Sequence, residues 1–232
     1  MCNIIEWFNK FLNRDMYPLK LAGVERGEPM TLEEADSGKV NKEQPRYCDR
    51  DANNQNYFIN CLSCVVAFEA RLRGYKVMAT PYEKSTYEKA AEDIRLCWLD
   101  SHDERPDFDY YTPDIITAEE FYKVLKRLIK PNERYILKYK VQRDDGATVY
   151  HVVNLINNNG ELIIIENQRG QINLTPNEFT WHHDNNSCKE NLEMYLKNYI
   201  DYSVKGKGPS LLRIDNKRFN LCYVNKILKE EV

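Results

Sequence analysis

Two cysteines three residues apart are the feature of this sequence that most clearly suggests a chemical function. Cys61 and Cys64 stand in the stretch NCLSCVVAFEARLRG, where Asn60 precedes them and an apolar run follows. A pair with this spacing can bind a metal ion, form a redox-active disulfide, or contain a thiol nucleophile beside a packing residue. The residues around the pair decide among these three chemistries.

The rest of the sequence argues against the metal and redox interpretations. A structural zinc site takes about four ligands, and no second Cys-x-x-Cys or His-x-x-x-His is present. His182, His183 and Cys188 offer ligand atoms, but their spacing matches no common zinc module. A thioredoxin-like pair follows a central strand, and the preceding NNQNYFIN is a poor candidate for one. We therefore expect neither a bound metal nor an organic cofactor.

A nucleophile at the start of a helix fits the segment best. Asn60 is a favoured N-cap residue, which makes Cys61 the first residue of the helix. There the positive end of the helix dipole favours a thiolate and lowers the thiol pKa. The backbone N–H of Cys61 is also placed to help bind an oxyanion. Cys64, one turn further on, is expected to pack as a small apolar residue, although a cap at Ser63 would make Cys64 the nucleophile instead.

A thiol nucleophile needs a base, and the chain has four histidines. His102 stands in the polar loop DSHDERPD, while His182 and His183 follow Trp181 in another loop. His151 differs because it lies in an expected strand, YHVVNLI. A histidine inside a strand is more often a core residue than a base, so its neighbours must show which it is.

An acidic residue at the end of the next expected strand supplies an orienting group. The run LIIIENQRG contains Glu166, which follows His151 by 15 residues (166 − 151 = 15). Antiparallel strands joined by a tight turn bring their outer ends side by side, so the two residues become neighbours. Glu166 can then accept a hydrogen bond from the imidazole and fix its tautomer, as the third member of a triad does. Gln168 is the alternative orienter or an oxyanion donor.

The elements that must position these residues follow one another as helices first and an antiparallel sheet afterwards. Expected helices cover 60–73, a segment from 85 to about 99, 118–129 and 189–200. Expected strands cover 75–79, 134–142, 147–156, 161–166, 210–214 and 221–224. Capping-box pairs are Thr31–Glu34, Ser85–Glu88, Thr117–Glu120 and Ser187–Glu190. This order indicates an α+β fold rather than alternating βαβ units.

Composition excludes several other functions. The chain has 232 residues, of which 42% are apolar, and a net charge of −3, so nothing indicates a nucleic-acid partner. No apolar run is long enough to span a membrane, and no Gly-rich phosphate loop is present. The N-terminus lacks the features of a signal peptide, and the seven cysteines are an odd number. We expect a cytoplasmic protein, or one delivered without a signal peptide.

One main domain with an N-terminal extension accounts for the whole length. An amphipathic apolar stripe over residues 3–13 predicts a helix, and we assign residues 1–22 to an extension that docks on the core or on a partner. Residues 23–232 are the domain proper, in which 23–56 form mostly a polar loop broken by Gly and Pro.

Three segments together resemble the papain-fold toxin 1 family, also called the glutamine deamidase toxin domain. They are NCLSCVVAFEARLRGYKVMA, YHVVNLIN and GELIIIENQRG, and the resemblance spans roughly residues 30–170. The matching positions are Asn60, Cys61, Cys64, Ala67, Glu69, Arg71, Arg73, Gly74, Val77, Ala79, His151, Asn154, Asn157, Gln168 and Gly170. Related domains also occur beside phage head proteins, and MTLEEADSGKVN is similar to the lead-in of some of them.

The resemblance implies a papain-like fold in which the helix with the nucleophile packs on an antiparallel sheet. It carries a Cys–His–Asp triad over as Cys61, His151 and Glu166, where Glu stands in place of the more frequent Asp. It implies deamidation of a glutamine on a protein substrate. A cysteine protease of the same fold and a non-catalytic structural or packaged phage component are the alternatives. We expect the charges of EARLRG to form ion pairs or a solvated helix face rather than to contact substrate.

Overall fold

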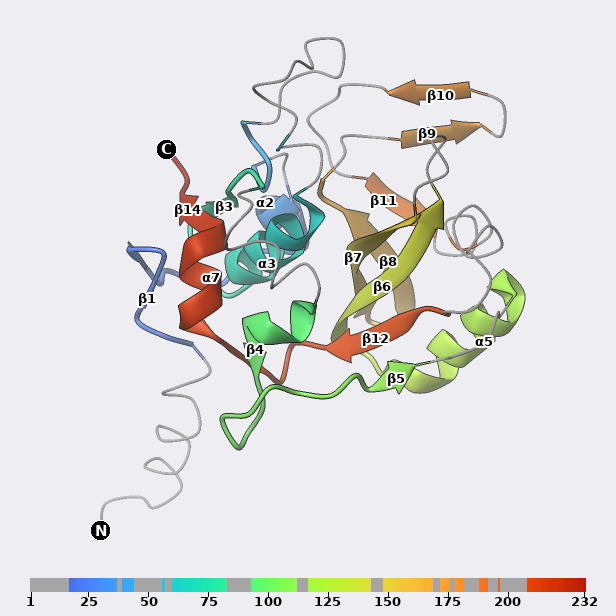
Figure 1. The fold of residues 1–232 in the computed structure, drawn as a ribbon, viewed down its shortest axis with the longest axis horizontal. Coiled ribbons are helices and arrows are strands. Elements are labelled where there is room, and N and C mark those ends of the chain that lie inside the picture. Colours follow the sequence, from blue (N-terminus) through green and yellow to red (C-terminus); the bar gives the residue numbers. More distant parts are fainter. Residues whose placement is uncertain are drawn as a thin grey trace.

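The computed structural model shows a six-stranded antiparallel sheet with helices on both sides (Figure 1). It describes residues 17–36, 39–43, 56, 60–82, 93–111, 117–142, 148–168, 172–175, 178–181, 188–191, 196 and 208–232. In spatial order the strands are β11 (Cys188–Asn191), β8 (Glu161–Glu166), β7 (Thr148–Asn158), β6 (Arg134–Gln142), β12 (Ser210–Arg213) and β5 (Tyr110–Tyr111). The α+β expectation is confirmed.

The consecutive strands β6, β7 and β8 form the predicted meander. Arg134 pairs with Ile156 at one end of the β6–β7 ladder and Gln142 with Thr148 at the other. Between β7 and β8 the chain reverses through Asn159 and Gly160, whose φ angles of 54° and 101° suit the tight hairpin turns that need positive φ. The predicted turn between β6 and β7 lies outside the described residues.

Alternate residues of the meander enter two different cores. One core contains Val65 and Phe68 of helix α3 (Cys61–Leu72) and takes Ile136 and Val152 from the sheet. The other contains residues of helix α5 (Ala118–Leu128) and takes the neighbouring residues of the same strands, such as Val153. Since successive side chains of a strand point to opposite faces, α3 and α5 cover opposite faces of the sheet. This fixes the helix that begins with Cys61 against one of them.

Helix α3 ends where its sequence predicts. Its C-cap is Arg73, and Gly74 follows with a φ of 99°, a conformation that favours glycine. Strand β3 (Val77–Ala79) then pairs with β14 (Leu228–Glu230) near the C-terminus. The capping boxes at Thr31–Glu34 and Thr117–Glu120 are both present, at the starts of α2 (Leu32–Asp36) and α5.

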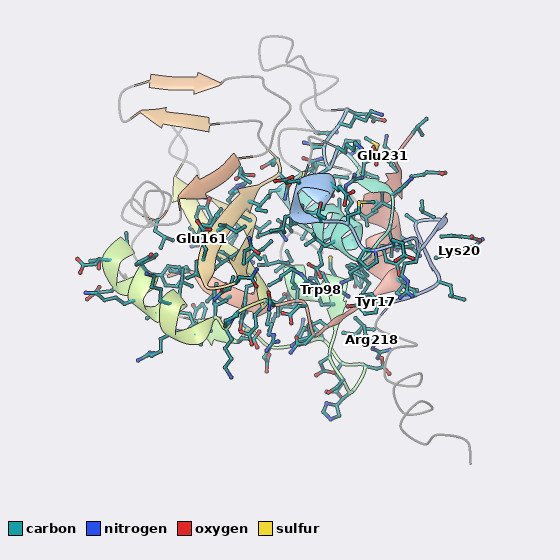
Figure 2. The ribbon with its side chains drawn as sticks, turned by 180° about the vertical axis from the view of Figure 1, so that it is seen from behind. Tyr17, Lys20, Trp98, Glu161, Arg218 and Glu231 are labelled. Atoms are coloured by element: carbon teal, nitrogen blue, oxygen red, sulfur yellow. The ribbon has the colours of Figure 1, made fainter. Side chains whose placement is uncertain are left out.

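The charges of EARLRG are buried and bind inside the protein. Glu69 is fully buried and pairs with Arg73 at 2.7 Å and with Arg134 of β6 at 2.8 Å. Arg71 donates to the backbone oxygens of Ala35 at 2.8 Å and Glu34 at 3.2 Å, and it pairs with Glu231 at 2.5 Å. Figure 2 shows Glu231 near α2 and Trp98 in the interior, where the Arg73 guanidinium lies 5.6 Å from its ring centre. The ion-pair expectation is confirmed, and a solvated helix face is excluded.

Several short elements complete the described fold. They are β1 (Lys20–Leu21), β2 (Val24–Glu25), the 3₁₀ helix η3 (Ile94–Cys97), β4 (Trp98–Leu99), β9 (Ile172–Thr175), β10 (Glu178–Trp181), β13 (Arg218–Phe219) and α7 (Leu221–Ile227). Within the described ranges no helix is long and apolar enough to cross a membrane.

Three expectations about secondary structure are wrong. The segment LCYV belongs to helix α7, because Asn220 caps it by accepting a bond from the Cys222 N–H and the short apolar run fits either period. Residues 188–191 form β11 rather than the start of a helix, since they pair with the otherwise open edge of β8. The residues expected to end a helix at about residue 99 instead form the 3₁₀ helix η3 and the strand β4. The expected helix at 3–13 and the start of the one from Ser85 lie outside the described residues.

Replacing Gly74 by alanine should strongly destabilise the protein. A Cβ there would overlap the Gly27 carbonyl oxygen and lie 2.9 Å from that of Glu28, and the positive φ adds strain. We expect a loss of about 3 kcal/mol or more in the free energy of unfolding, measured by urea denaturation. Gly160→Ala is the matched control, because its φ is 101° but nothing lies within 4 Å of the added Cβ. It should cost only about 1–2 kcal/mol, and equal losses in both variants would contradict the steric explanation.

Candidate active site

The structure brings Cys61, His151 and Glu166 together from three different elements. Cys61 is the first residue of α3, His151 lies on β7, and Glu166 is the last residue of β8. His151 Nε2 and Glu166 Oε2 are 2.5 Å apart, and the Cys61 side chain hydrogen-bonds the imidazole as well. Because Glu166 occupies Nε2, Nδ1 is the ring nitrogen left for the thiol. The predicted neighbourhood of His151 and Glu166 is confirmed.

The surroundings of His151 favour its charged form. Burial lowers the pKa of the imidazole, but the Glu166 charge, the hydrogen bonds to Cys61 and Glu166 and the Cys61 charge together raise it to about 9. His151 is 9% exposed and Glu166 3% exposed, so solvent screens their attraction little. An imidazolium at neutral pH in turn stabilises a thiolate on Cys61, which is the reactive form of a cysteine.

The Glu166 carboxylate is held through both of its oxygens. While Oε2 meets the imidazole, Oε1 accepts a hydrogen bond from the backbone N–H of Gln168 at 3.0 Å. The Gln168 carbonyl accepts in turn from the Asn41 side chain at 3.3 Å. Gln168 therefore fixes the carboxylate through its backbone, which differs from the side-chain contact that the sequence suggested.

Asn60 occupies the predicted N-cap position, but its side chain makes no capping hydrogen bond. Fully buried, it instead donates to Asn41 Oδ1 and to the Thr80 carbonyl, both at 3.0 Å. These bonds attach the start of α3 to two loops. Asn41 thus contacts both Asn60 and the Gln168 carbonyl. Sequence reasoning missed it, because one asparagine in a polar, Gly- and Pro-broken segment gives no specific signal.

Cys64 is more deeply buried than Cys61. It is 1% exposed, and its Sγ–H donates to Asn60 Oδ1 at 3.4 Å. Burial raises the pKa of this thiol well above its usual range, and the nearby Cys61 and Glu166 charges raise it further. A buried neutral thiol is a poor nucleophile. Cys64 therefore has the environment of a packing residue one turn behind Cys61.

A second pair of asparagines links the three elements by hydrogen bonds. Asn154 of β7 donates to the Val65 carbonyl of α3 at 3.3 Å, and Asn167, which follows Glu166, donates to Asn154 Oδ1 at 3.3 Å. Both asparagines are at least nine-tenths buried. One amide thus links the helix of Cys61, the strand of His151 and the end of the strand of Glu166. Hydrogen-bonded supports of this kind fix the geometry of reactive groups.

The other histidines do not join the site, as far as the structure describes them. The His102 side chain is 81% exposed, as its polar loop predicted. His182 and His183 lie outside the described residues. Among the described residues, no group of three or more His, Cys, Asp or Glu side chains could hold a metal ion.

Alkylation with iodoacetamide should distinguish the cysteines. Near neutral pH, Cys61 should react roughly tenfold faster than Cys222, because His151 stabilises its thiolate. Cys222 is exposed and serves as the ordinary thiol for comparison. Cys64 and Cys97 are buried and should stay unlabelled, the pKa of Cys97 being raised to about 12 mainly by burial. Peptide mapping by mass spectrometry measures each rate.

The variant His151→Ala should bring the Cys61 rate down to that of Cys222. If the fastest label falls on Cys64, or if Cys61 in the unmodified chain reacts no faster than Cys222, the thiolate–imidazolium interpretation is wrong.

Comparison with known proteins gives one match. The model of a family described as papain fold toxin 1, glutamine deamidase matches residues 59–171, a stretch that contains Cys61, His151 and Glu166. Neither the curated proteins nor the solved structures gave a match. The matched stretch includes helix α3 and strands β7 and β8, which carry most of the resemblance noted in the sequence, and also β6 between them in the chain. Residues 59–171 of this chain are therefore similar to the papain fold toxin 1, glutamine deamidase family.

Proposed function

We propose that the protein deamidates glutamine side chains of a protein substrate, with Cys61 as nucleophile, His151 as acid and base, and Glu166 as the group that orients the imidazole. One observation carries this proposal. The three residues make a connected hydrogen-bonded chain inside the stretch that matches the glutamine deamidase family. Toxin-like or effector-like activity is the corresponding biological class.

In the first half-reaction the Cys61 thiolate attacks the Cδ carbon of a glutamine carboxamide. A C–S bond forms, and the carbonyl π electrons move onto oxygen. The backbone N–H of Cys61, which lies in the first turn of α3 and points out of its N-terminal end, is the proposed donor to this oxyanion. As the tetrahedral intermediate collapses, the His151 imidazolium gives its proton to the leaving nitrogen. The C–N bond breaks, ammonia leaves, and a thioester remains.

In the second half-reaction the now neutral imidazole takes a proton from water. The resulting hydroxide attacks the thioester carbon, the C–S bond breaks, and the glutamate side chain is released. The thiolate and the imidazolium are restored, so the cycle needs no metal or organic cofactor. Throughout both steps Glu166 keeps the imidazole in one tautomer and orientation, as an acidic residue does in other triads.

The extra methylene of Glu166 relative to aspartate is compatible with this role. Its carboxylate reaches His151 Nε2 at 2.5 Å while its other oxygen is held by the Gln168 N–H. The longer side chain is thus fixed at its far end, where a free glutamate would rotate. This supports an orienting role for Glu166 in place of the more frequent aspartate.

Release of ammonia from glutamine-containing proteins tests the proposal. The wild-type protein should release ammonia and convert glutamine to glutamate, as seen by intact-mass and peptide-mapping spectra of the substrate. Cys61→Ala should abolish this activity, and His151→Ala should lower it by roughly 10²–10⁴-fold. Glu166→Gln should lower the rate, and Glu166→Asp should retain more of it. Cys64→Ala is the control, expected to keep most of the activity.

The products also separate deamidation from the other candidates. A new N-terminus in the substrate, without ammonia release, would show a cysteine protease instead. If a panel of proteins yields neither product above the level of Cys61→Ala, the protein is not a hydrolase of this kind, and a structural or packaged role replaces the proposal.

A further inference from the structure

A pocket next to His151 takes no part in the reaction proposed above. It has a volume of about 190 Å³. Its lining includes Phe108, Tyr111, Lys138, Tyr139, Tyr150 and Ser210. Tyr111 comes from β5, Ser210 from β12, Lys138 and Tyr139 from β6, and Tyr150 from β7, which are four consecutive strands of the sheet. The pocket therefore lies on the sheet that also carries His151.

Tyr139 connects this pocket to the candidate active site. It borders the pocket, and its ring packs edge-on against the His151 imidazole with centroids 5.6 Å apart and an interplanar angle of 83°. Tyr150, on the other wall, is the residue immediately before His151. Tyr139 is paired with His151 and packs in the core on the α5 side, so both rings point to the face of the sheet opposite Lys138. The pocket therefore neighbours the imidazole across strands β6 and β7.

The strand register places much of the pocket on the face of the sheet that α3 covers. Ser210 is paired with Tyr111 on one side and with Lys138 on the other, and Lys138 is paired with Val152. Directly paired residues point to the same face of a sheet. Val152 packs in the core that contains α3 and against which Cys61 also packs. The pocket and the thiol therefore border the same core.

The chemistry of the lining is aromatic and cationic. The Lys138 ammonium lies 4.3 Å from the centre of the Tyr150 ring, and that of Lys140 lies 5.4 Å from it. These cation–π contacts hold both ammonium groups in place. Tyr111 and Tyr150 are 53% and 45% exposed, so their rings are open to a partner.

The size of the pocket favours one side chain over a whole small molecule. Pockets that enclose drug-sized ligands typically measure about 300–1,000 Å³, and this one is smaller. A carboxylate is the group that a fixed ammonium attracts most, and tyrosine rings and hydroxyls suit its methylene groups and oxygens. An aspartate or glutamate side chain meets all three conditions.

We propose that this pocket binds an acidic side chain of the protein substrate, a few residues along the chain from the glutamine that reaches Cys61. The proposal rests on the proposed function in treating the bound chain as substrate. Lys138 supplies the charge, and Tyr111 and Tyr150 supply the walls. The protein then selects glutamines that have an acidic neighbour.

Binding to an inactive variant tests the pocket without requiring turnover. Two peptides differ only in whether glutamate or lysine stands near a central glutamine, and fluorescence anisotropy with a neutral label measures their affinities for Cys61→Ser protein. We expect the glutamate peptide to bind roughly tenfold more tightly, with the preference shrinking at high salt. Lys138→Gln should remove the preference, and Lys138→Arg, which keeps the charge, should restore it. Thermal unfolding confirms that each variant is folded.

Lys123→Gln is the matched control, because Lys123 is an exposed lysine on α5, away from the pocket. It should leave the preference unchanged. Equal binding of the two peptides, undetectable binding of both, or a preference that survives Lys138→Gln would overturn the proposal. Ammonia release by the wild-type protein is measured separately. If acidic peptides bind but no ammonia appears, the pocket stands and the deamidase assignment fails.

Discussion

The hydrogen bond between Glu166 and His151 is the interaction on which the candidate site depends, because it joins two strands where their ladder has ended. The last paired residues of β7 and β8 at this end are Asn154 and Ile165. Beyond them, His151 is paired with Tyr139 of β6, and Glu166 with Cys188 of β11. The two side chains meet across strands that are held by different outer neighbours. A buried carboxylate and imidazole in this position stabilise each other's charge, and the charge on the imidazole in turn favours a thiolate at Cys61.

Helix α3 can present Cys61 to this pair because both of its ends are fixed. At the N-terminal end, Asn60 bonds to Asn41 and to the Thr80 carbonyl. At the C-terminal end, buried ion pairs of Arg71 and Arg73 and the close approach of Gly74 to Gly27 hold the chain. Reactive groups gain most when their supports keep them within a fraction of an ångström of the productive geometry. The buried charges of α3 therefore serve the site indirectly, by fixing the helix that carries the nucleophile.

The features of the structure that could be predicted from the sequence are those set by local rules. Cap residues and a terminal glycine predicted the positions of α3 and α5. The alternating strands with a tight turn predicted that His151 lies beside Glu166. What the sequence could not predict depends on long-range pairing. Strand β11 forms because β8 has an edge to fill, and Asn41 contacts the site across 127 positions of sequence. The helix α7 shows a third case, since a four-residue apolar run satisfies the period of a strand and of a helix equally.

A titration of the His151 imidazole by NMR shows whether this buried histidine is charged at neutral pH. We expect a midpoint near pH 9, because the Glu166 charge and the hydrogen bonds to Cys61 and Glu166 outweigh burial. By linkage, the stability gained from this proton is fully present below about pH 6.5 and is lost as pH rises through about 9. Glu166→Gln removes the acceptor charge and should move the midpoint to lower pH. A wild-type midpoint near the ordinary 6.5, or one that Glu166→Gln leaves unchanged, would show that Glu166 does not stabilise a charged imidazole.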